Sequence, residues 1–341
     1  MNFVNPYVIA EIGINHNGSS ELAKLMCELS IKAGASAVKF QLFEPDELVA
    51  KQAEMADYQK NNSSKSETQH SMLSRNKIDL ETLRECRIIC RKNNIDFICT
   101  AFNETSLYDV LELEPDFIKW PSGEIDNLPF LRLACQPKLP IIISTGMSNA
   151  DEVKDAVEVC TKNGLDRESI ILLHCTSQYP TPVESANISS VNYLKATFGT
   201  LVGFSDHTMG SSAAKLALAS GAQIFEKHVS LSRLMDGVDH KASATFDELQ
   251  EYISDLKFAS SVIGSFEKTC FPVEAQTKTI ARKSLVAKVN IKSGEDLDET
   301  NLTAKRPGIG ISPKYLTEIT GHRANKDISP GHILTWADIS K

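Results

Sequence analysis

The stretch that decides the fold is Gly203-Phe204-Ser205-Asp206-His207-Thr208, together with a similar stretch at Phe225-Glu226-Lys227-His228. Each stretch follows a short hydrophobic run, and an alanine-rich segment at 211–220 lies between them and ends at a glycine. This order predicts a strand, a helix and a second strand, with a histidine at the C-terminal end of each strand. In parallel α/β proteins, ligands bind at those strand ends.

The two histidines are expected to converge on one site. Because side chains alternate along a strand, His207 shares a face with Ser205. By the same alternation, His228 shares a face with Glu226. A single histidine at a strand end is more often a structural residue. The pairing instead favours half of a metal site, with His207 and His228 as the ligands from the protein.

The composition is that of an ordinary globular protein. Hydrophobic residues make up 42% of the 341 residues and charged residues 23%. We see no apolar run that would span a membrane and no cleavable leader in residues 1–10, so we expect a cytoplasmic protein. The eight cysteines form no CxxC pair, which fits free thiols in a reducing compartment. A net charge of −8 argues against nucleic acid as a partner and requires a locally basic pocket for an anionic substrate.

From residue 7 onward, the chain repeats a unit made of a short apolar strand, a polar strand end and an amphipathic helix. The first six predicted strands, which precede the two opening stretches, are 7–14, 37–43, 96–102, 117–120, 140–147 and 170–176. Eight such units over about 250 residues are what a TIM barrel requires. The alternative, a doubly wound sheet, requires a glycine-rich phosphate fingerprint after its first strand, and the turn at 13–18 (GINHNG) does not fit it. We therefore predict a (β/α)8 TIM barrel.

Two segments depart from this repeat. Residues 44–77 are polar and weakly periodic, and a loop of that length is usually functional, so we expect it to cover the substrate. Beyond residue 280, short β-like runs alternate with turns such as Pro307-Gly308-Ile309-Gly310. The predicted organisation is a TIM-barrel catalytic domain at 1–265, a linker at 266–280 and a small β-rich domain at 281–341.

Two lysines stand at predicted strand ends, where a barrel interior normally has branched apolar side chains. A buried lysine is costly unless it faces an anion, so Lys39 and Lys119 indicate an anion-binding pocket. The structural alternative is that each lysine forms a buried pair with Glu11 or Glu226.

Other strand-end side chains would complete this pocket. Four hydroxyl donors suit the phosphate and carboxylate of a phosphorylated acid such as phosphoenolpyruvate: Thr100, Ser122, Ser144 and Ser205. Glu11 and Glu124 are candidate proton donors and acceptors. A divalent metal would polarise a carbonyl or acidify a bound water, and two histidines with oxygen donors suit Mn²⁺ or a similar ion.

The motifs of this chain resemble those of the sialic acid synthase family, in order and over nearly the whole length. They are 9–18 (IAEIGINHNG), 38–41 (VKFQ), 119–124 (KWPSGE), 144–147 (STGM), 173–176 (LHCT), 179–182 (YPTP), 204–207 (FSDH), 226–228 (EKH), 239–243 (DHKAS) and 305–310 (KRPGIG). The C-terminal part resembles the antifreeze-like (SAF) domain of that family. The resemblance implies an enzyme that condenses phosphoenolpyruvate, an N-acetylated mannose-type sugar and water into a nine-carbon 2-keto acid and phosphate.

The resemblance also implies roles for individual residues. The residues matching the phosphoenolpyruvate contacts are Lys39, Thr100, Lys119, Ser122, Ser144 and Ser205. Those matching the sugar contacts in the barrel are Gln41, Tyr179 and Asp239. The expected catalytic set is Glu11, Glu124, Lys119, His207 and His228. Among these, Glu124 matches the proton-handling carboxylate, and the two histidines hold a metal that polarises the aldehyde of the sugar. We expect Mn²⁺, with Mg²⁺ and Co²⁺ as alternatives.

The small domain is expected to complete the active site of a second subunit. The family resemblance implies a domain-swapped homodimer. In it, Arg306, on a rigid Pro-Gly turn, would hydrogen-bond the N-acetyl oxygen of the partner's sugar.

Members of the family differ in the sugar that they take. Our first expectation is an N-acetylneuraminate synthase, and the alternative is an N,N'-diacetyllegionaminate or pseudaminate synthase that uses a 2,4-diacetamido-2,4,6-trideoxyhexose. We expect segment 44–77 to decide between them. Two departures from the family pattern, at 99–102 (CTAF) and 229–232 (VSLS), affect details of the sugar pocket. Two other classes are a metal-independent pyruvate aldolase with a Schiff-base lysine and a non-enzymatic protein whose last domain is an ice- or carbohydrate-binding module on an inert barrel. The polar strand ends argue against the latter.

Overall fold

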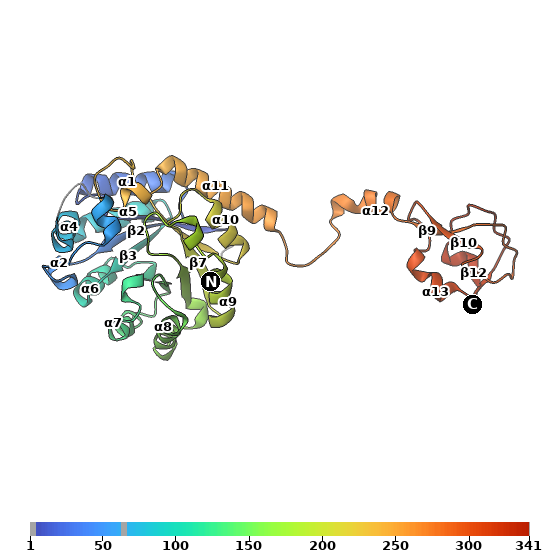
Figure 1. The fold of residues 1–341 in the computed structure, drawn as a ribbon, viewed down its shortest axis with the longest axis horizontal. Coiled ribbons are helices and arrows are strands. Elements are labelled where there is room, and N and C mark those ends of the chain that lie inside the picture. Colours follow the sequence, from blue (N-terminus) through green and yellow to red (C-terminus); the bar gives the residue numbers. More distant parts are fainter. Residues whose placement is uncertain (1–4, 63–66, 341) are drawn as a thin grey trace. The chain divides into compact units, whose positions relative to one another are not determined.

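The computed structural model describes residues 5–62 and 67–340, and the chain divides into two compact units, Met1–Gly264 and Ser265–Lys341. The first unit is a closed barrel of eight parallel strands in sequence order, in which β1 also pairs with β8 (Figure 1). The strands are β1 (Tyr7–Gly13), β2 (Ala37–Leu42), β3 (Asp96–Ala101), β4 (Phe117–Trp120), β5 (Ile141–Ser144), β6 (Ile170–His174), β7 (Leu201–Ser205) and β8 (Ile224–His228). The predicted (β/α)8 barrel is confirmed.

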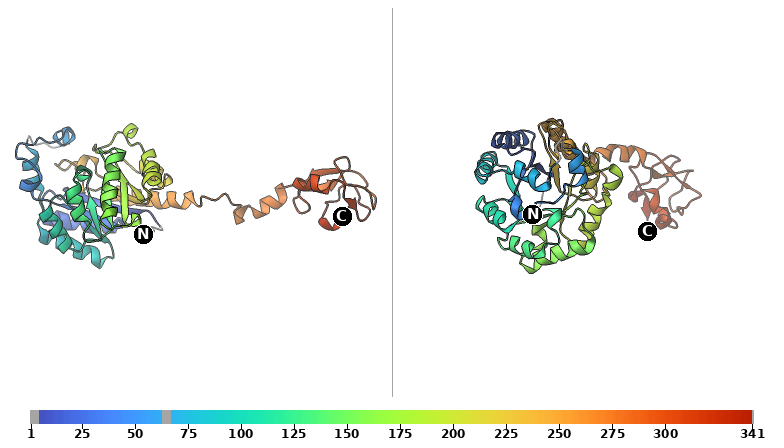
Figure 2. Two further views of the ribbon diagram at one scale, coloured as in Figure 1. Left: turned by 90° about the horizontal axis from the view of Figure 1, so that it is seen from below. Right: turned by 60° about the vertical axis from the view of Figure 1, so that its left-hand side comes forward.

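Helices surround the barrel, as the right-hand view of Figure 2 shows. The main ones, each following one strand, are α1 (Ser20–Lys32), α5 (Leu80–Lys92), α6 (Glu104–Glu112), α7 (Leu128–Ala134), α8 (Ala150–Lys162), α9 (Ser189–Phe198), α10 (Ser212–Ala219) and α11 (Phe246–Ile263). Phe40, Phe97 and Phe204 lie on the strands and belong to the large core cluster that includes the inner faces of these helices. Helix α8 begins with the predicted capping box, in which Asn149 and Glu152 each accept a backbone hydrogen bond from the other.

The character of the barrel interior changes along each strand. Ile9 and Ile98 belong to a separate apolar cluster in the interior. Glu11 and Thr100, two residues further along the same strands, line a cavity instead. Because residues two apart share a face of a strand, a polar layer stands above an apolar one. The strands therefore support a polar site at their C-terminal ends.

Segment 44–77 is more regular than the sequence indicated. It contains three short helices: α2 (Pro45–Leu48), α3 (Asp57–Asn62) and α4 (Gln69–Asn76). The prediction of an irregular loop is wrong for these stretches because helices of four to eight residues are too short to show clear periodicity. Thr68 caps α4 by accepting a hydrogen bond from the backbone of Ser71. Residues 63–66 of the expected cover lie outside the described residues.

The second unit is built from short strands around its own core. Strands β9 (Ser284–Ala287) and β10 (Leu302–Lys305) pair antiparallel, as do β11 (Arg323–Ala324) and β12 (Ile339–Ser340). Its helices are α12 (Ala275–Ala281) and α13 (Leu316–Ile319), and α12 begins within the stretch 266–280 that the sequence suggested as a linker. Leu285, Leu297 and Leu334 are fully buried in its apolar core. The β-rich character predicted for this part is confirmed.

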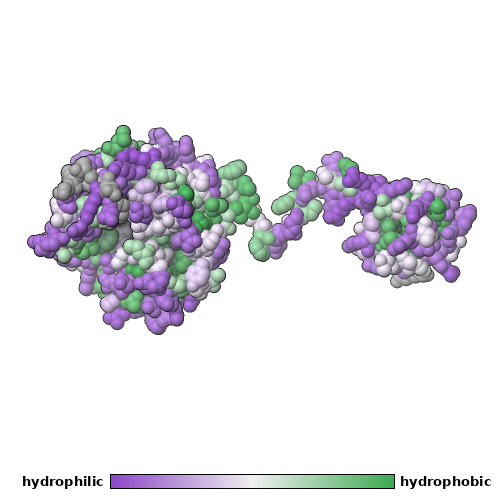
Figure 3. Space-filling view, in the orientation of Figure 1, coloured by the Kyte–Doolittle hydropathy of each residue, from purple (hydrophilic) through white to green (hydrophobic). Residues whose placement is uncertain are grey.

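The surface of the barrel unit is mostly hydrophilic in the view of Figure 3, with apolar residues on the exposed end of α11. In that helix, Phe258 is 70% exposed and Val262 is 67% exposed. Within residues 5–62 and 67–340, we find no helix with the length and apolar character needed to cross a membrane.

Candidate active site

A cavity of about 830 Å³ opens where the barrel strands end. It brings together every site residue that the sequence placed in the barrel: Glu11, Lys39, Gln41, Thr100, Lys119, Ser122, Glu124, Ser144, Tyr179, Ser205, His207, His228 and Asp239. Arg306 lies in the C-terminal unit, where its Nε donates to the backbone oxygen of Ala281 at 2.9 Å. The predicted barrel residues therefore share one cavity.

The floor of the cavity holds two lysines and two carboxylates. Lys39 Nζ lies 2.8 Å from Glu11 Oε2 and 3.8 Å from Glu226 Oε2. Lys119 Nζ lies 3.7 Å from Glu226 Oε2, and all four side chains are at most 5% exposed. The buried pairs that the sequence left as a structural alternative are thus present. Because the charges of the four groups balance, an entering anion would compete with carboxylates for the lysines.

Strand register explains these pairs. Glu11 lies directly opposite Lys39 across β1 and β2, and Thr100 lies opposite Lys119 across β3 and β4. Glu226 lies on β8, which pairs with β1 on one side and β7 on the other. It contacts Lys119 of β4 through the middle of the barrel and not along a sheet edge. The sequence predicted this pair only as an alternative. Contacts across the barrel interior join strands that are not neighbours in the sheet, and they form only when the barrel closes.

Burial and the opposite charges set the protonation states on the floor. Burial lowers the pKa of Lys39, but Glu11 and Glu226 outweigh it and raise that pKa above its usual value. Burial lowers the pKa of Lys119, which Glu226 only partly offsets. Against the effect of burial, Lys119 and Lys39 lower the pKa of Glu226 to about 2. Burial raises the pKa of Glu11 in spite of Lys39, so Glu11 is the carboxyl on the floor that takes up a proton more readily.

Hydroxyl groups surround the two ammonium groups. Lys39 donates to Thr100 Oγ1 at 3.3 Å, and Lys119 donates to Ser144 Oγ at 2.8 Å. Ser205 Oγ lies 3.3 Å from Glu226 Oε1 and the same distance from His207 Nε2. These hydroxyls and the lysines form a set of donors suited to phosphate and carboxylate oxygens.

His207 and His228 lie side by side, with their rings edge to face and the ring centroids 5.4 Å apart. His207 Nδ1 lies 2.8 Å from the backbone oxygen of Thr176, which leaves Nε2 towards the cavity. His228 Nδ1 is buried, has no hydrogen-bond partner in the described part of the chain, and lies 3.8 Å from Asp239 Oδ2. Burial lowers the pKa of both imidazoles, so both are neutral at pH 7 and able to ligate a metal. Tyr179 packs on the His207 ring with centroids 4.0 Å apart.

The donor set fits an open metal site and does not fit a closed structural one. In residues 5–62 and 67–340, no group of three or more His, Cys, Asp or Glu side chains is arranged to hold a metal ion. The chain would therefore contribute two imidazoles, and water or substrate oxygens would supply the other ligands. An open coordination sphere of this kind is what a catalytic Lewis acid requires.

The remaining predicted residues lie around this centre. Glu124 is in the 3₁₀ turn Ser122–Glu124, and its carboxylate accepts a hydrogen bond from Asn127 at 2.8 Å. Gln41 donates to Glu11 at 2.8 Å. Burial, reinforced by Glu11, raises the pKa of Asp239 to about 7. Hydrogen bonds thus hold Glu124 and Gln41 in place, and burial favours the protonated form of Asp239.

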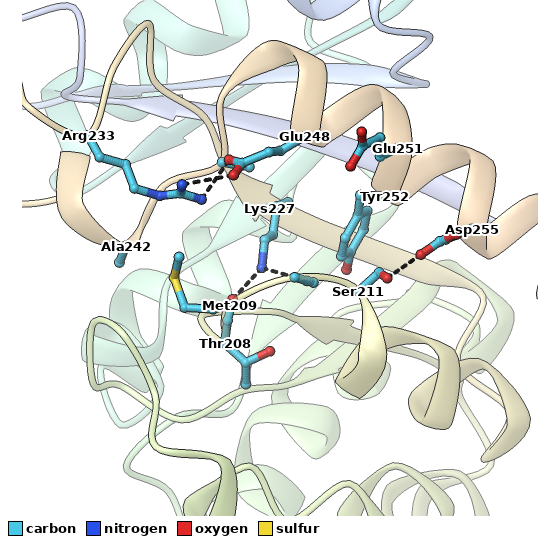
Figure 4. A pocket seen from close by; sticks show the side chains of 12 residues that line it. Thr208, Met209, Ser211, Lys227, Arg233, Ala242, Glu248, Glu251, Tyr252 and Asp255 are labelled. Carbon is cyan, nitrogen blue, oxygen red and sulfur yellow. Dashed lines mark hydrogen bonds and ion pairs between the residues drawn. The ribbon is translucent and has the colours of Figure 1, made fainter.

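A second ion pair lies behind the histidines. Lys227 Nζ is 3.2 Å from Asp206 Oδ2, with both side chains at most 3% exposed. Figure 4 shows Lys227 directed towards the loop at Thr208, whose backbone oxygen accepts from it at 2.5 Å. Asp206 also accepts from the backbone and hydroxyl of Thr208 at 2.8 and 2.6 Å. The pair joins the ends of β7 and β8 and so supports both histidines. Sequence reasoning missed it, although opposite charges precede both histidines.

The family follows from comparison of the chain with known proteins. Residues 26–268 match the model of the NeuB family, and residues 282–340 match that of the SAF domain. The chain belongs to the NeuB family. It is 39% identical over 327 residues to an N,N'-diacetyllegionaminic acid synthase of Campylobacter jejuni, covering 96% of this chain and 98% of that protein. A synthase of the same name from Legionella pneumophila is 36% identical, covering 98% of this chain and 94% of that protein.

A solved structure leads to the same family. The N-acetylneuraminic acid synthetase of Leptospira borgpetersenii, in complex with citrate, superposes with a TM-score of 0.71 at 28% identity. The match covers 80% of this chain and 90% of that one. As a NeuB family member with a SAF domain, the chain is an enzyme of the phosphoenolpyruvate-dependent, condensing type. The predicted enzyme class is confirmed.

Proposed function

We propose that this NeuB family enzyme is an N,N'-diacetyllegionaminate synthase, which condenses phosphoenolpyruvate with a 2,4-diacetamido-2,4,6-trideoxyhexose and water. The observation that carries the proposal is a pair of buried lysines among hydroxyl donors beside two neutral imidazoles. The choice of sugar rests on the two relatives of that name, each similar over nearly the whole chain. N-acetylneuraminate synthase, our first expectation from sequence, stays the second candidate because of the similarity to the Leptospira structure.

Lys39 and Lys119 would bind the two acidic groups of phosphoenolpyruvate. Thr100, Ser144 and Ser205 donate hydrogen bonds beside them, together with Ser122 further along the lining. On binding, the substrate would replace Glu226 as the partner of the ammonium groups. This exchange keeps each buried lysine paired with an anion throughout.

The reaction joins C3 of phosphoenolpyruvate to the aldehyde carbon of the sugar. A divalent metal held by His207 and His228, for which Mn²⁺ is our first choice, would polarise the aldehyde. Water then adds at C2 and gives up a proton, and phosphate leaves as C2 becomes a ketone. Glu11, whose pKa burial raises, is suited to accept or return a proton, and Glu124 is the second candidate. Gln41, Tyr179 and Asp239 would position the sugar.

The functional unit would be a domain-swapped homodimer. Exposed apolar side chains on α11, such as Phe258 and Val262, and Phe266 beyond it would be covered by a second subunit. Arg306, at the surface of the C-terminal unit, would then complete the sugar site of the partner chain.

A panel of sugars tests the proposal. Phosphate release and product mass are measured with phosphoenolpyruvate, Mn²⁺ and one of three acceptors: the 2,4-diacetamido-2,4,6-trideoxyhexose, N-acetylmannosamine and N-acetylmannosamine 6-phosphate. We expect the first acceptor to give the highest kcat/KM and a nine-carbon 2-keto acid. Turnover of N-acetylmannosamine alone would favour the second candidate, and borohydride trapping of a pyruvate adduct would indicate an aldolase instead.

A further inference from the structure

One side of the cavity is apolar, in contrast to its charged floor. We call it the apolar wall, and it consists of Ile14, Phe43, Met72, Leu73, Phe102 and Val238, all of which line the cavity. Five of the six are buried members of one hydrophobic cluster, against which Phe102 packs. The rings of Phe43 and Phe102 meet edge to face with centroids 6.1 Å apart. The wall is therefore a continuous apolar surface.

The wall is assembled from segments far apart in the chain. Ile14, Phe43 and Phe102 come directly after β1, β2 and β3, so they stand above that part of the barrel. Helix α4 contributes Met72 and Leu73, and Arg75 in the same helix pairs with Glu67 at 2.7 Å. The segment 44–77 thus adds an apolar face to the cavity, although its sequence is mostly polar.

The charges near the wall do not suit a second anionic group. In the described residues, the only lysines and arginines that line the cavity are Lys39 and Lys119, both on the floor. In the described part of segment 44–77, the cationic side chains that form ion pairs do so with carboxylates outside the cavity lining. Lys77 lies 2.5 Å from Glu44, and Lys60 lies 2.5 Å from Glu54. A sugar phosphate at the wall would lose hydration without gaining a cation.

We propose that the apolar wall binds the C6 methyl group of a 6-deoxy sugar and selects against sugars with a hydroxyl or phosphate at C6. The inference rests on the proposed function, in which the aldehyde end of the open-chain sugar lies beside His207 and His228. The C6 end must then contact another part of the lining, and the wall offers it apolar surface. A hydroxyl placed there loses hydrogen bonds to water, whereas a methyl group gains from leaving water.

Two acceptors that differ only at C6 test this proposal. They are 2,4-diacetamido-2,4,6-trideoxymannose and its 6-hydroxy counterpart, each measured with the full-length enzyme, saturating phosphoenolpyruvate and Mn²⁺. We expect kcat/KM to be about 10–100-fold higher for the 6-deoxy sugar, the range that one such group provides in an apolar pocket. The 6-phosphorylated counterpart should show no turnover above background.

Variants of the wall should reduce this preference. Val238→Thr keeps the shape of the side chain and adds a hydroxyl, and Leu73→Asn adds an amide at similar size. Each should lower the ratio of the two kcat/KM values at least threefold. The KM for phosphoenolpyruvate should stay within about twofold of the wild-type value, because the ionic and hydroxyl partners of the floor lysines are Glu11, Glu226, Thr100 and Ser144. Val157→Thr, a buried valine of α8 outside the cavity lining, is the matched control and should leave the ratio unchanged.

Several outcomes would overturn the inference. Equal kcat/KM values for the two sugars in the wild-type enzyme would do so even if no variant folded. An unchanged ratio in both wall variants, with circular dichroism showing a native fold, would also do so. Efficient use of both sugars would contradict the proposed role of the apolar wall but would be compatible with the proposed function. Failure to release phosphate with either sugar would remove both.

Discussion

Replacing Glu226 with glutamine perturbs the charge balance of the cavity floor. Its carboxylate lies 3.7 Å from Lys119 and 3.8 Å from Lys39. At these distances, Coulomb's law with an effective dielectric constant of about 20 gives about 4.5 kcal/mol for each contact. Desolvation of the carboxylate offsets much of this energy. The fall of its pKa from 4.5 to about 2 gives a net figure of about 3 kcal/mol at neutral pH.

We therefore expect Glu226→Gln to lower the free energy of unfolding of the barrel by about 3–5 kcal/mol, because it leaves a buried lysine without its partner. The sign of the pH dependence follows from the lowered pKa of Glu226. Its contribution is complete above pH 4.5 and is lost as the pH falls through about 2. Measurements at pH 7.5 therefore detect the whole effect.

Urea unfolding of the full-length protein measures this loss. The chain has two tryptophans, and Trp336→Phe leaves Trp120 of β4 as the fluorescent reporter of the barrel. Saturating phosphoenolpyruvate should narrow the difference in the free energy of unfolding between Glu226→Gln and the parent protein, since the negative charges of the substrate replace the missing carboxylate. Glu158→Gln, which removes an exposed pair with Lys162 at 2.8 Å, is the control and should cost less than about 1 kcal/mol.

Two results would refute this reasoning. One is a free energy of unfolding for the Glu226→Gln barrel within 1 kcal/mol of the parent value in the absence of phosphoenolpyruvate. The other is a variant that phosphoenolpyruvate stabilises no more than it stabilises the parent. Either result would mean that Glu226 is not the counter-ion that the substrate replaces.

Three further predictions concern the metal, the second subunit and the C-terminal unit. Chelation should abolish phosphate release and Mn²⁺ should restore it, and His207→Ala should bind Mn²⁺ at least tenfold more weakly in a direct titration; full activity in metal-free enzyme would contradict this. Mixing inactive Arg306→Ala with inactive His207→Ala subunits should restore part of the activity if Arg306 acts on the partner chain, and proven subunit exchange without recovery would contradict it. Although burial raises the pKa of Asp338, Lys326 at 2.6 Å and His332 at 3.0 Å hold it well below its usual range. The resulting stabilisation is present above about pH 4 and is lost at lower pH, so Trp336 fluorescence should report an acid transition of the C-terminal unit. In Asp338→Asn, the free energy of unfolding of this unit should be lower by about 1.5–3 kcal/mol at pH 7, and the acid transition should be absent. An unchanged acid transition in the variant would contradict the prediction.

Strand periodicity was enough to predict the barrel and the polar side chains that its strand ends place in the cavity. Residues two apart on a strand share a face, so Ser205 with His207 and Glu226 with His228 were placed correctly from their spacing alone. The ends of the strands were predicted less accurately than their positions. For example, the predicted strand 140–147 extends past β5, which ends at Ser144. The chain turns there, and Met147 has a φ of 61°. No hydrophobic pattern reports such a turn.

Contacts between distant segments could not be predicted in the same way. Glu226 contacts Lys119 because the barrel closes. Asp206 and Lys227 alternate with the cavity residues along β7 and β8 and pair with each other on the other face of these strands. The apolar wall joins α4, three strand ends and Val238. In each case the partner is set by three-dimensional closure, which a local periodicity of two or 3.6 residues does not contain.

The most direct measurement follows the oxygen that bridges C2 and phosphorus in phosphoenolpyruvate. The substrate is labelled with ¹⁸O at that position and incubated with enzyme, Mn²⁺ and the 2,4-diacetamido-2,4,6-trideoxyhexose. If water adds at C2 and phosphate leaves from that carbon, the label must appear in the released phosphate, and one nine-carbon 2-keto acid without the label must form per phosphate. Label retained in the organic product, or phosphate released together with free pyruvate, would contradict the proposed condensation.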